Sequence, residues 1–283
     1  MLNTGMALRF GDVTMTADFQ NSFNDAEAYE RYVGRWSARI ARPFLRWLAV
    51  PPGRRWLDVG AGTGILTQAV LDEARPAAVV GVDFSAAYVA LARQRVQDER
   101  VEFKTGDAAA LHFDPPGFDV AAAGLVLNFV PSPEAMVQSM QQAVRDGGLI
   151  AVYVWDYAGG MEMMRQFWDA AVQLDPAAAD QDSGPRFLIC RPENLQMCFQ
   201  DAGLESVTVI PVEVETRFRD FDDFWQPFYG AQGSVARYFR GLNDAMRDDL
   251  REQLRRQLPV AEDGSIPLRA RAWAAKGRKP VSA

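Results

Sequence analysis

The middle of the chain alternates between short, continuous apolar runs and stretches in which apolar residues recur every three or four positions. The runs predict strands over 54–60, 77–84, 101–107, 118–129 and 148–157, and the stretches predict helices over 64–74, 85–97 and 133–148. Strands separated by helices pair in parallel, and strands that lack an alternating pattern are buried on both faces. This segment therefore predicts a parallel sheet with helices on both faces.

The last third of the chain follows a looser version of the same pattern. Helices are expected over 161–174, 192–202 and 242–258, and strands over 204–218 and 266–277. These two strands bring the predicted sheet to seven. We therefore expect an α/β fold with a doubly wound, mostly parallel, Rossmann-like sheet of seven strands and a helical insertion between strands six and seven.

An amphipathic helix is predicted near the N-terminus, from Asp25 to Leu48. Its apolar stripe consists of Tyr29, Tyr32, Val33, Trp36, Ile40, Phe44 and Leu48. A Pro-Pro-Gly sequence at 51–53 then ends the helix. Three aromatic residues of the stripe, Tyr29, Tyr32 and Trp36, could close over a bound ligand, and packing in the core explains them equally well.

These patterns divide the chain into segments with different expected roles. We expect a flexible N-terminal arm at 1–22, a helical lid at 23–52, an α/β core at 53–220, a helical insertion at 221–262, and a final strand and tail at 263–283. The insertion is rich in aromatic residues between Phe221 and Tyr238. It could cap a binding site, or its aromatic residues could form a core or a dimer contact.

Composition and charge narrow the possible partners. The chain has 283 residues, of which 48% are hydrophobic and 24% are charged, and its formal net charge is −7. Proteins that hold nucleic-acid phosphates normally have a basic excess, so nucleic acid is disfavoured as a partner. No apolar stretch reaches the roughly 18–20 residues that span a membrane, and the N-terminus lacks the apolar segment of a secretory signal. We expect a cytoplasmic protein without a membrane partner.

The two cysteines, Cys190 and Cys198, are too few for a disulfide framework. They also lack a second pair at the spacing of a zinc site. We therefore expect them to be small buried apolar residues, and we predict no bound metal.

A glycine-rich segment joins the first predicted strand of the sheet to the following helix. Gly60, Gly62 and Gly64 let the backbone turn sharply and let a ligand approach the main chain. The free N–H groups at the start of the helix favour anionic groups. The dinucleotide fingerprint G-x-G-x-x-G would need its third glycine at position 65, which is Ile65. These glycines could form a ligand site or only a tight turn, and their spacing disfavours a dinucleotide as the ligand.

Two acidic residues follow the next two strands. Asp83 ends the second strand, where a carboxylate can accept hydrogen bonds from both hydroxyls of a ribose. Asp107 ends the third strand, where it can accept one from the amine of adenine. Either residue alone could be a helix cap or a turn former. Because the carboxyl ends of parallel strands share one edge, the two together indicate a nucleoside site.

These motifs resemble those of the class I S-adenosylmethionine-dependent methyltransferases, and in particular the group that acts on small molecules. The resemblance rests on WLDVGAGTG at 56–64, VVGVDFS at 79–85, KTGDAAALHF at 104–113 and FDVAAAGLVLNFVPSPEAM at 118–136. It covers roughly residues 54 to 157. The N-terminal helix and the last third of the chain match only in outline.

The resemblance implies a set of cofactor-binding residues for S-adenosylmethionine. The methionine moiety would lie beside Gly60, Ala61, Gly62 and Gly64, with Asp58 near its amino group. Asp83 would hold the ribose, and Phe84 would pack against adenine. The edge of the adenine would contact Asp107 and Ala108, and the sulfonium would lie beside Leu125. The implied activity is transfer of the methyl group to a small organic acceptor by direct in-line displacement.

The sequence offers few candidates for a general base. Asp156, after the fifth strand, could be a catalytic base, an orienter of the acceptor or a turn residue. The single histidine, His112, precedes the fourth strand and should lie at the opposite edge of the sheet. Related sequences often carry histidine where this chain has Asn128, so a base at that position is in doubt. We take Asp156 as the candidate catalytic residue.

Two other functions remain open. The chain could be a binding protein that keeps the nucleoside pocket and lacks catalytic activity, which the asparagine at position 128 would favour. It could also be a nicotinamide-dependent oxidoreductase, although the glycine spacing argues against this. The partner is expected to be a small-molecule methyl acceptor, and the protein a monomer or a homodimer.

Overall fold

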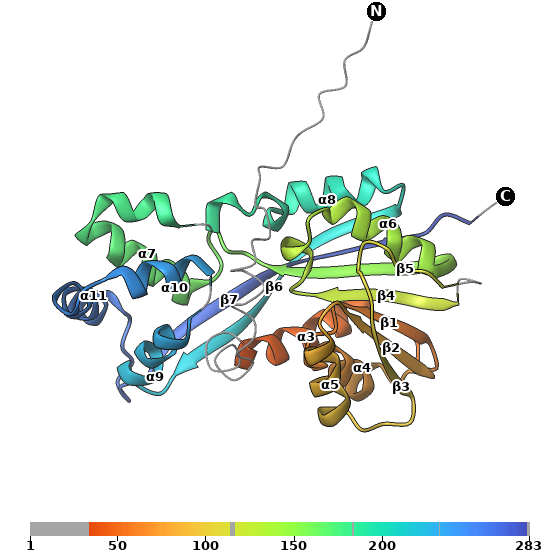
Figure 1. Ribbon diagram of the computed structural model, residues 1–283, viewed down its shortest axis with the longest axis horizontal. Helices are drawn as coiled ribbons and strands as arrows, with labels where there is room; N and C mark the ends of the chain where they lie inside the picture. Colours follow the sequence, from red (N-terminus) through yellow and green to blue (C-terminus); the bar gives the residue numbers. More distant parts are fainter. Residues whose placement is uncertain (1–33, 114–116, 183, 232, 282–283) are drawn as a thin grey trace, which may run out of the picture.

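The computed structural model describes residues 34–113, 117–182, 184–231 and 233–281. Its centre is a seven-stranded sheet with the order β3-β2-β1-β4-β5-β7-β6 (Figure 1). The strands are β1 (Arg55–Val59), β2 (Ala78–Asp83), β3 (Val101–Thr105), β4 (Phe118–Gly124), β5 (Val144–Trp155), β6 (Glu205–Phe218) and β7 (Ile266–Arg278). The first five pair in parallel, and β7 is antiparallel to both β5 and β6. The predicted seven-stranded, mostly parallel sheet is confirmed.

Helices cover both faces of the sheet (Figure 1). One face carries α3 (Arg35–Leu48), α4 (Ile65–Ala74) and α5 (Ala86–Arg95), and the other carries α6 (Pro133–Ala143) and α8 (Pro192–Asp201). Four more helices lie beside the carboxyl end of β6 and the amino end of β7: α7 (Glu162–Leu174), α9 (Phe221–Trp225), α10 (Gly233–Gly241) and α11 (Asp244–Gln257). Short 3-10 turns are η2 (Leu127–Phe129), η3 (Pro176–Gln181), η4 (Gly184–Arg186), η5 (Leu188–Cys190) and η6 (Gln226–Gly230).

The central strands send alternate side chains into two cores. Trp56 of β1 and Val120 of β4 belong to the core on the side of α3 and α4. Their neighbours Leu57 and Ala121 belong to the core on the side of α6 and α8. All four are at most 1% exposed. Because both faces are buried, these strands read as continuous apolar runs in the sequence.

One predicted helix is shorter than expected. The helix predicted over 133–148 ends at Ala143, because Val144 is extended and pairs with Phe118 as the first residue of β5. Gly147, with a φ of +70°, lies inside this strand, where the register between β4 and β5 shifts. Pairing with the neighbouring strand therefore overrides the helical pattern of the local sequence.

The fourth strand also ends earlier than the predicted 118–129. The backbone leaves the sheet after Gly124, because Leu125 has a φ of +61°. The N–H of Leu125 still donates to the carbonyl oxygen of Tyr153 in β5, at 2.8 Å, and η2 follows. The turn at Leu125 therefore places η2 directly above the carboxyl end of β4.

The helical insertion between β6 and β7 is built around aromatic rings. The ring of Phe167 in α7 stacks on Phe228 with centroids 4.8 Å apart, and Trp225 lies 5.4 Å from Phe239. These four side chains are at most 3% exposed, whereas Tyr229 is 57% exposed. Core packing therefore accounts for most of the aromatic content. That the insertion caps a binding site stays a prediction.

Part of the predicted N-terminal lid falls outside the described residues, which begin at residue 34. This applies to the arm at 1–22 and to Tyr29 and Tyr32. Within α3, Trp36 is 3% exposed, and its ring centroid lies 5.5 Å from that of Phe218 at the end of β6. Packing in the core therefore explains Trp36, and the role of the helix as a lid stays a prediction.

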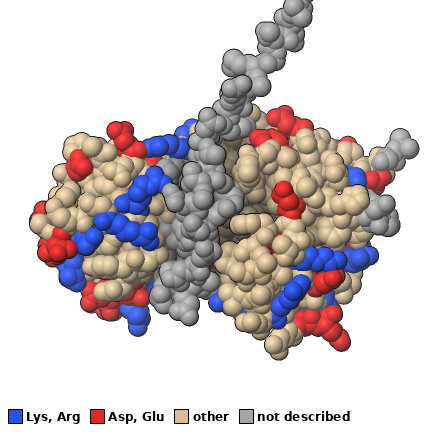
Figure 2. All heavy atoms as spheres, in the orientation of Figure 1, with Lys and Arg blue, Asp and Glu red and all other residues tan. Residues whose placement is uncertain are grey.

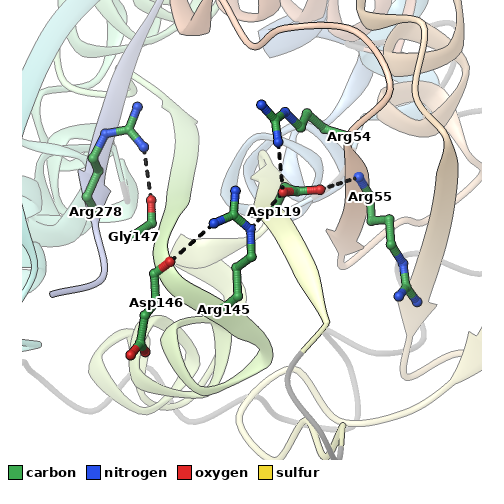
Figure 3. A network of polar contacts seen from close by, with 7 residues as sticks. All are labelled: Arg54, Arg55, Asp119, Arg145, Asp146, Gly147 and Arg278. Atoms are coloured by element: carbon green, nitrogen blue, oxygen red, sulfur yellow. Dashed lines mark hydrogen bonds and ion pairs between the residues drawn. The ribbon is translucent and has the colours of Figure 1, made fainter. Parts of the chain in front are cut away.

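A polar network lies at the amino ends of the parallel strands (Figure 3). Asp119 accepts hydrogen bonds from the backbone N–H of Arg55 at 2.8 Å and from Nε of Arg145 at 2.8 Å. Nη1 of Arg54 lies 3.4 Å from the same carboxylate. These contacts connect β1, β4 and β5 at the edge opposite their carboxyl ends, so they fix the sheet and do not form the candidate site.

None of the helices that the structure describes is long and apolar enough to cross a membrane. Figure 2 shows acidic and basic side chains at both ends of the molecule in this view. The expectations of a cytoplasmic protein without a nucleic-acid partner stay predictions.

Candidate functional site

The glycine-rich segment between β1 and α4 folds against β2. The backbone N–H groups of Gly60 and Ala61 both donate to the carbonyl oxygen of Val82, at 2.7 and 3.0 Å. The φ angles of Gly60, Gly62 and Gly64 are +73°, +52° and +85°. Residues with a Cβ rarely adopt such angles, so the conformation itself calls for glycine at all three positions. The result is a tight loop at the carboxyl end of β1.

The space beside each glycine differs. A Cβ on Gly60 would lie 2.6 Å from Cγ2 of Val126, and a Cβ on Gly64 would lie 2.9 Å from Cγ2 of Val96. A Cβ on Gly62 would meet no atom within 4 Å. Gly60 and Gly64 are therefore required by packing within the protein, whereas Gly62 borders open space that a ligand could enter.

Asp83 connects the end of β2 to this loop. Its Oδ2 accepts a hydrogen bond from the backbone N–H of Gly62, and its Oδ1 accepts one from the N–H of Ser85, both at 2.9 Å. Burial raises the pKa of Asp83, and the hydrogen bonds from Ser85 and Gly62 oppose that rise. A carboxylate can accept roughly four hydrogen bonds, so two positions remain for hydroxyl groups of a ligand.

Asp58 is buried in β1 beside the same loop and is 1% exposed. Its Oδ2 accepts a hydrogen bond of 2.6 Å from the hydroxyl of Thr67 in α4, and its Oδ1 is buried without a partner. Burial raises the pKa of Asp58 to about 7, the Thr67 bond lowers it, and the charge of Asp83 adds to the rise. A buried carboxylate oxygen without a donor is unfavourable, and a cationic donor of a ligand would remove that penalty.

The residues expected at an adenine ring lie at the ends of β2 and β3, which are neighbours in the sheet. Phe84 is 59% exposed, so its ring is available for packing. Asp107 is exposed, and its Oδ1 accepts a hydrogen bond of 2.9 Å from the N–H of Ala109. Ala108, which follows Asp107, is half-buried. The structure therefore brings Phe84 and Asp107 to the same edge as Gly62, with Asp107 in a turn.

The end of β4 combines strain with unpaired polar atoms. Leu125, at a φ of +61°, occupies a conformation that leucine rarely adopts. Val126 follows and covers Gly60. In η2, both the side-chain nitrogen and the side-chain oxygen of Asn128 are buried, and neither has a hydrogen-bond partner among the residues that the structure describes. Strain and unsatisfied polar groups concentrate at functional sites, so this turn belongs to the candidate site.

Asp156, the candidate base, is held by groups of the protein. Its Oδ2 accepts hydrogen bonds from Nε and Nη2 of Arg271 in β7, at 2.8 and 2.7 Å, and its Oδ1 accepts one from the N–H of Gly159 at 3.1 Å. The residue is 5% exposed. The geometry favours the turn-forming alternative, and a catalytic role for Asp156 stays a prediction.

The remaining residues singled out from the sequence are one histidine and the two cysteines. His112 is exposed in the loop that leads to the amino end of β4. Cys190 and Cys198 are buried and unpaired, as predicted, and burial raises the pKa of the Cys198 thiol to about 12. Among the described residues, no group of three or more His, Cys, Asp or Glu side chains could hold a metal ion.

Two partners of site residues were not predicted from the sequence. Thr67, in the first turn of α4, donates a hydrogen bond to Asp58. The only sequence signal for this contact is that Thr67 follows Asp58 by nine residues, across the glycine loop. Arg271 pairs with Asp156 across 115 residues of sequence, and no local pattern indicates such a contact. Both contacts depend on how the sheet is assembled.

Comparison with known sequences identifies the segment that carries these features. A family model described as a methyltransferase domain matches residues 57–152. A 2-phytyl-1,4-naphtoquinone methyltransferase of Thermosynechococcus vestitus is 35% identical over 127 residues, which are 43% of this chain and 56% of that protein. A trans-aconitate 2-methyltransferase of Rhodopseudomonas palustris is 32% identical over 133 residues, which are 47% of this chain and 50% of that protein. The chain thus spans about half the length of these relatives.

Solved structures share the architecture. Phosphoethanolamine N-methyltransferase 2 of Haemonchus contortus, in complex with S-adenosyl-L-methionine, superposes with a TM-score of 0.54 over 95% of this chain and 59% of that chain. The two sequences are 19% identical, so this similarity concerns the fold alone. The segment matched by the family model includes Asp58, Gly62, Asp83 and Leu125.

Proposed function

We propose that this chain is a class I S-adenosylmethionine-dependent methyltransferase that transfers a methyl group from that cofactor to a small organic acceptor. The observation that carries the proposal is the common position of Asp58, Gly62, Asp83 and Leu125 at the carboxyl ends of β1, β2 and β4. Open α/β sheets bind their ligands at this edge, next to the point where the strand order reverses.

The side chains at this edge fit S-adenosylmethionine. The unpaired Oδ1 of Asp58 would accept a hydrogen bond from the ammonium group, and the open space beside Gly62 leaves room for the methionine moiety. Asp83 would accept hydrogen bonds from the ribose hydroxyls at the positions that Gly62 and Ser85 leave free. The exposed ring of Phe84 would pack against adenine.

The other expected contacts have smaller roles. Gly60 and Gly64 allow the tight turn of the loop, and the backbone N–H of Ala61 binds the carbonyl oxygen of Val82 in β2. Asp107 and Ala108 would meet the edge of the adenine ring. Of these two, Asp107 has a carboxylate that is exposed and only partly used by its own turn, so it can still accept a hydrogen bond from the adenine amine.

The residues of this chain would act mainly by positioning. The bound cofactor supplies a methyl group on a sulfonium, which leaves as a neutral thioether. The turn at Leu125 and Val126 would border the methyl group and keep water from it, while the acceptor is held in line. Proximity and orientation of this kind can supply roughly 7–11 kcal/mol of the barrier reduction. Asp156, paired with Arg271, would hold the turn after β5 and so position the acceptor.

The acceptor class is inferred from the relatives. Their names give a naphthoquinone and trans-aconitate as acceptors, which are both small organic molecules. A small organic acceptor is therefore proposed here. A cytoplasmic location and a monomeric or homodimeric state are proposed on sequence grounds alone.

Titration calorimetry with S-adenosylhomocysteine tests the proposal, because product binding needs no acceptor. Binding that Asp83→Ala weakens, together with transfer of labelled methyl to a metabolite fraction, is the expected result. Binding of NADH without binding of S-adenosylhomocysteine would instead favour an oxidoreductase. Binding of S-adenosylhomocysteine without methyl transfer to any fraction would favour a non-catalytic nucleoside-binding protein.

A further inference from the structure

We infer that the side-chain amide of Asn128 holds the methyl acceptor, and that this acceptor is a planar ring with an amino group beside a carbonyl group. This inference rests on the proposed function and specifies its acceptor. It starts from the two buried, unpaired amide atoms of Asn128. Arg35 also has two buried unpaired nitrogens, but its third nitrogen is bonded to Asp223, so it is partly satisfied.

The position of Asn128 places its partner on the acceptor side of the site. The residues that fit a nucleoside follow β1, β2 and β3, which lie on one side of β4 in the sheet. The turn η2, which carries Asn128, instead contacts β5, η5 and α6. These contacts of η2 therefore lie on the side of β4 away from β2, which carries Asp83. A ligand group that pairs with the amide belongs to a second molecule beside the cofactor.

Aromatic rings on the same side of β4 indicate a planar partner. Phe129, next to Asn128, lies 6.2 Å from Phe187 between ring centroids, and Phe187 lies 5.1 Å from Tyr157 after β5. All three rings are half-buried. These rings come from η2, from the turn after β5 and from the residue before η5, so three separate segments bring aromatic rings together beside the turn that carries Asn128. Aromatic faces of this kind favour a flat apolar ligand.

The chemistry of the amide specifies the polar edge of that ligand. An asparagine side chain offers an acceptor oxygen and a donor nitrogen side by side. Its Oδ1 would accept a hydrogen bond from an amino N–H of the ligand, and its Nδ2 would donate to the adjacent carbonyl oxygen. Because the N–H is held by Oδ1, the lone pair of the amino nitrogen stays free to face the methyl group.

An amino nitrogen also agrees with the groups available for proton transfer. An amide takes up no proton near neutral pH, and the carboxylate of Asp156 is paired with Arg271. A hydroxyl acceptor would need a base to become nucleophilic, whereas an aromatic amine is neutral at pH 7. Its lone pair forms the new bond to the methyl carbon as the carbon–sulfur bond breaks, and the electron pair of that bond stays on sulfur. The methylated nitrogen then loses its proton to water.

The test uses 2-aminobenzamide as the probe, with 2-hydroxybenzamide as the matched compound. In protein saturated with S-adenosylhomocysteine, the side-chain ¹⁵N–¹H signals of Asn128, assigned with Asn128→Leu, should shift when 2-aminobenzamide is added. With S-adenosylmethionine, 2-aminobenzamide should be methylated on its amino group, and 2-hydroxybenzamide at least about tenfold more slowly at pH 7. Unshifted Asn128 signals, or faster methylation of the hydroxyl compound, would overturn the inference.

A pair of asparagine variants separates binding from folding. Asn128→Leu removes two unpaired buried atoms, so it should unfold at the same or a higher temperature while KM for the probe rises about tenfold or more. Asn194→Leu is the matched control, because Asn194 Nδ2 already donates to the Leu188 carbonyl oxygen at 2.8 Å. It should unfold at a lower temperature with an unchanged KM. A destabilised Asn128→Leu with an unchanged KM would contradict a role in acceptor binding.

Failure of this inference is distinguishable from failure of the proposed function. If the wild-type protein does not bind S-adenosylhomocysteine in the calorimeter, the proposed function itself is wrong, and the inference falls with it. If S-adenosylhomocysteine binds but the Asn128 signals do not respond to the probe, only the assignment of the acceptor fails. Asn128→Leu should bind S-adenosylhomocysteine within about twofold of wild type, because η2 contacts β5, η5 and α6, and the residues that fit the nucleoside follow β1, β2 and β3.

Discussion

The carboxylate of Asp83 accepts a hydrogen bond from the backbone N–H of Gly62, with 2.9 Å between oxygen and nitrogen. The two residues are 21 positions apart: Asp83 is the last residue of β2, and Gly62 lies in the loop after the neighbouring strand β1. This bond fixes the glycine loop relative to the acid that would hold the ribose. The contact therefore acts together with the bonds of Gly60 and Ala61 to Val82, which hold the loop, and with the bond from Ser85, which orients the carboxylate.

Replacing Asp83 should weaken cofactor binding. Asp83→Ala removes the acceptor of the Gly62 N–H and the expected partner of the ribose hydroxyls, so the affinity for S-adenosylhomocysteine should fall roughly 10- to 100-fold, about 1–3 kcal/mol. Calorimetric titration of the purified variant measures this. Asp98→Ala is the control, because Asp98 binds only the nearby Arg100 at the surface. Equal affinities of the two variants would count against the assignment of Asp83.

The three loop glycines should respond differently to alanine. Gly62→Ala should cost about 1–2 kcal/mol of unfolding free energy for its left-handed backbone and should weaken S-adenosylhomocysteine binding. Gly60→Ala should cost more stability, because its Cβ would overlap Val126. Gly53→Ala is the matched control, since Gly53 has a φ of +77° and equally open space, before β1. Thermal unfolding and calorimetry measure both effects, and a Gly62→Ala protein that binds as tightly as Gly53→Ala would remove Gly62 from the site.

Asp58 should make stability depend on pH. Burial raises its pKa from 3.8 to about 7, so the folded protein binds this proton more tightly than the unfolded chain does. Protonation of Asp58 therefore stabilises the folded protein fully below about pH 4. This contribution to the unfolding free energy declines as the pH rises through 7 and is absent above that. Asp58→Asn should therefore unfold at a higher temperature than wild type at pH 8 and at a similar temperature at pH 4. A difference between the two proteins that does not change with pH would contradict the raised pKa.

The same group should couple cofactor binding to proton release. An ammonium group beside Oδ1 of Asp58 favours the charged carboxylate and lowers its pKa, so binding near pH 7 should release a proton. Calorimetry in two buffers of different ionisation enthalpy measures the number of protons. Asp58→Asn should release none. Equal proton release from both proteins would show that another group titrates on binding.

Asp156→Asn decides between a structural and a catalytic role. Loss of the charge opposite Arg271 should lower the unfolding free energy by about 1.5–3 kcal/mol, and kcat should change only a few-fold. The control is Glu213→Gln, because Glu213 lies 3.7 Å from the same guanidinium and is half-exposed. It should change little in either measurement. A loss of kcat of about 100-fold or more at unchanged stability would make Asp156 the general base.

The sequence by itself determined the order of the strands along the chain and the residues at their carboxyl ends. Continuous apolar runs such as 148–157 identify strands because burial on both faces removes the alternating pattern. Gly62, Asp83 and Asp107 could be placed at one edge because crossover connections make neighbouring strands parallel. Local chemistry and a general rule of topology were sufficient for that.

Only the tertiary structure decided how these residues are paired. The helix predicted over 133–148 ends at Ala143 because Val144 finds a strand partner in Phe118, which no local pattern reveals. The pairing of Asp156 with Arg271, and the lack of any partner for the amide of Asn128, likewise depend on residues far away in the sequence. A side chain's role follows from which donors and acceptors surround it, and the packing of the whole chain sets those surroundings.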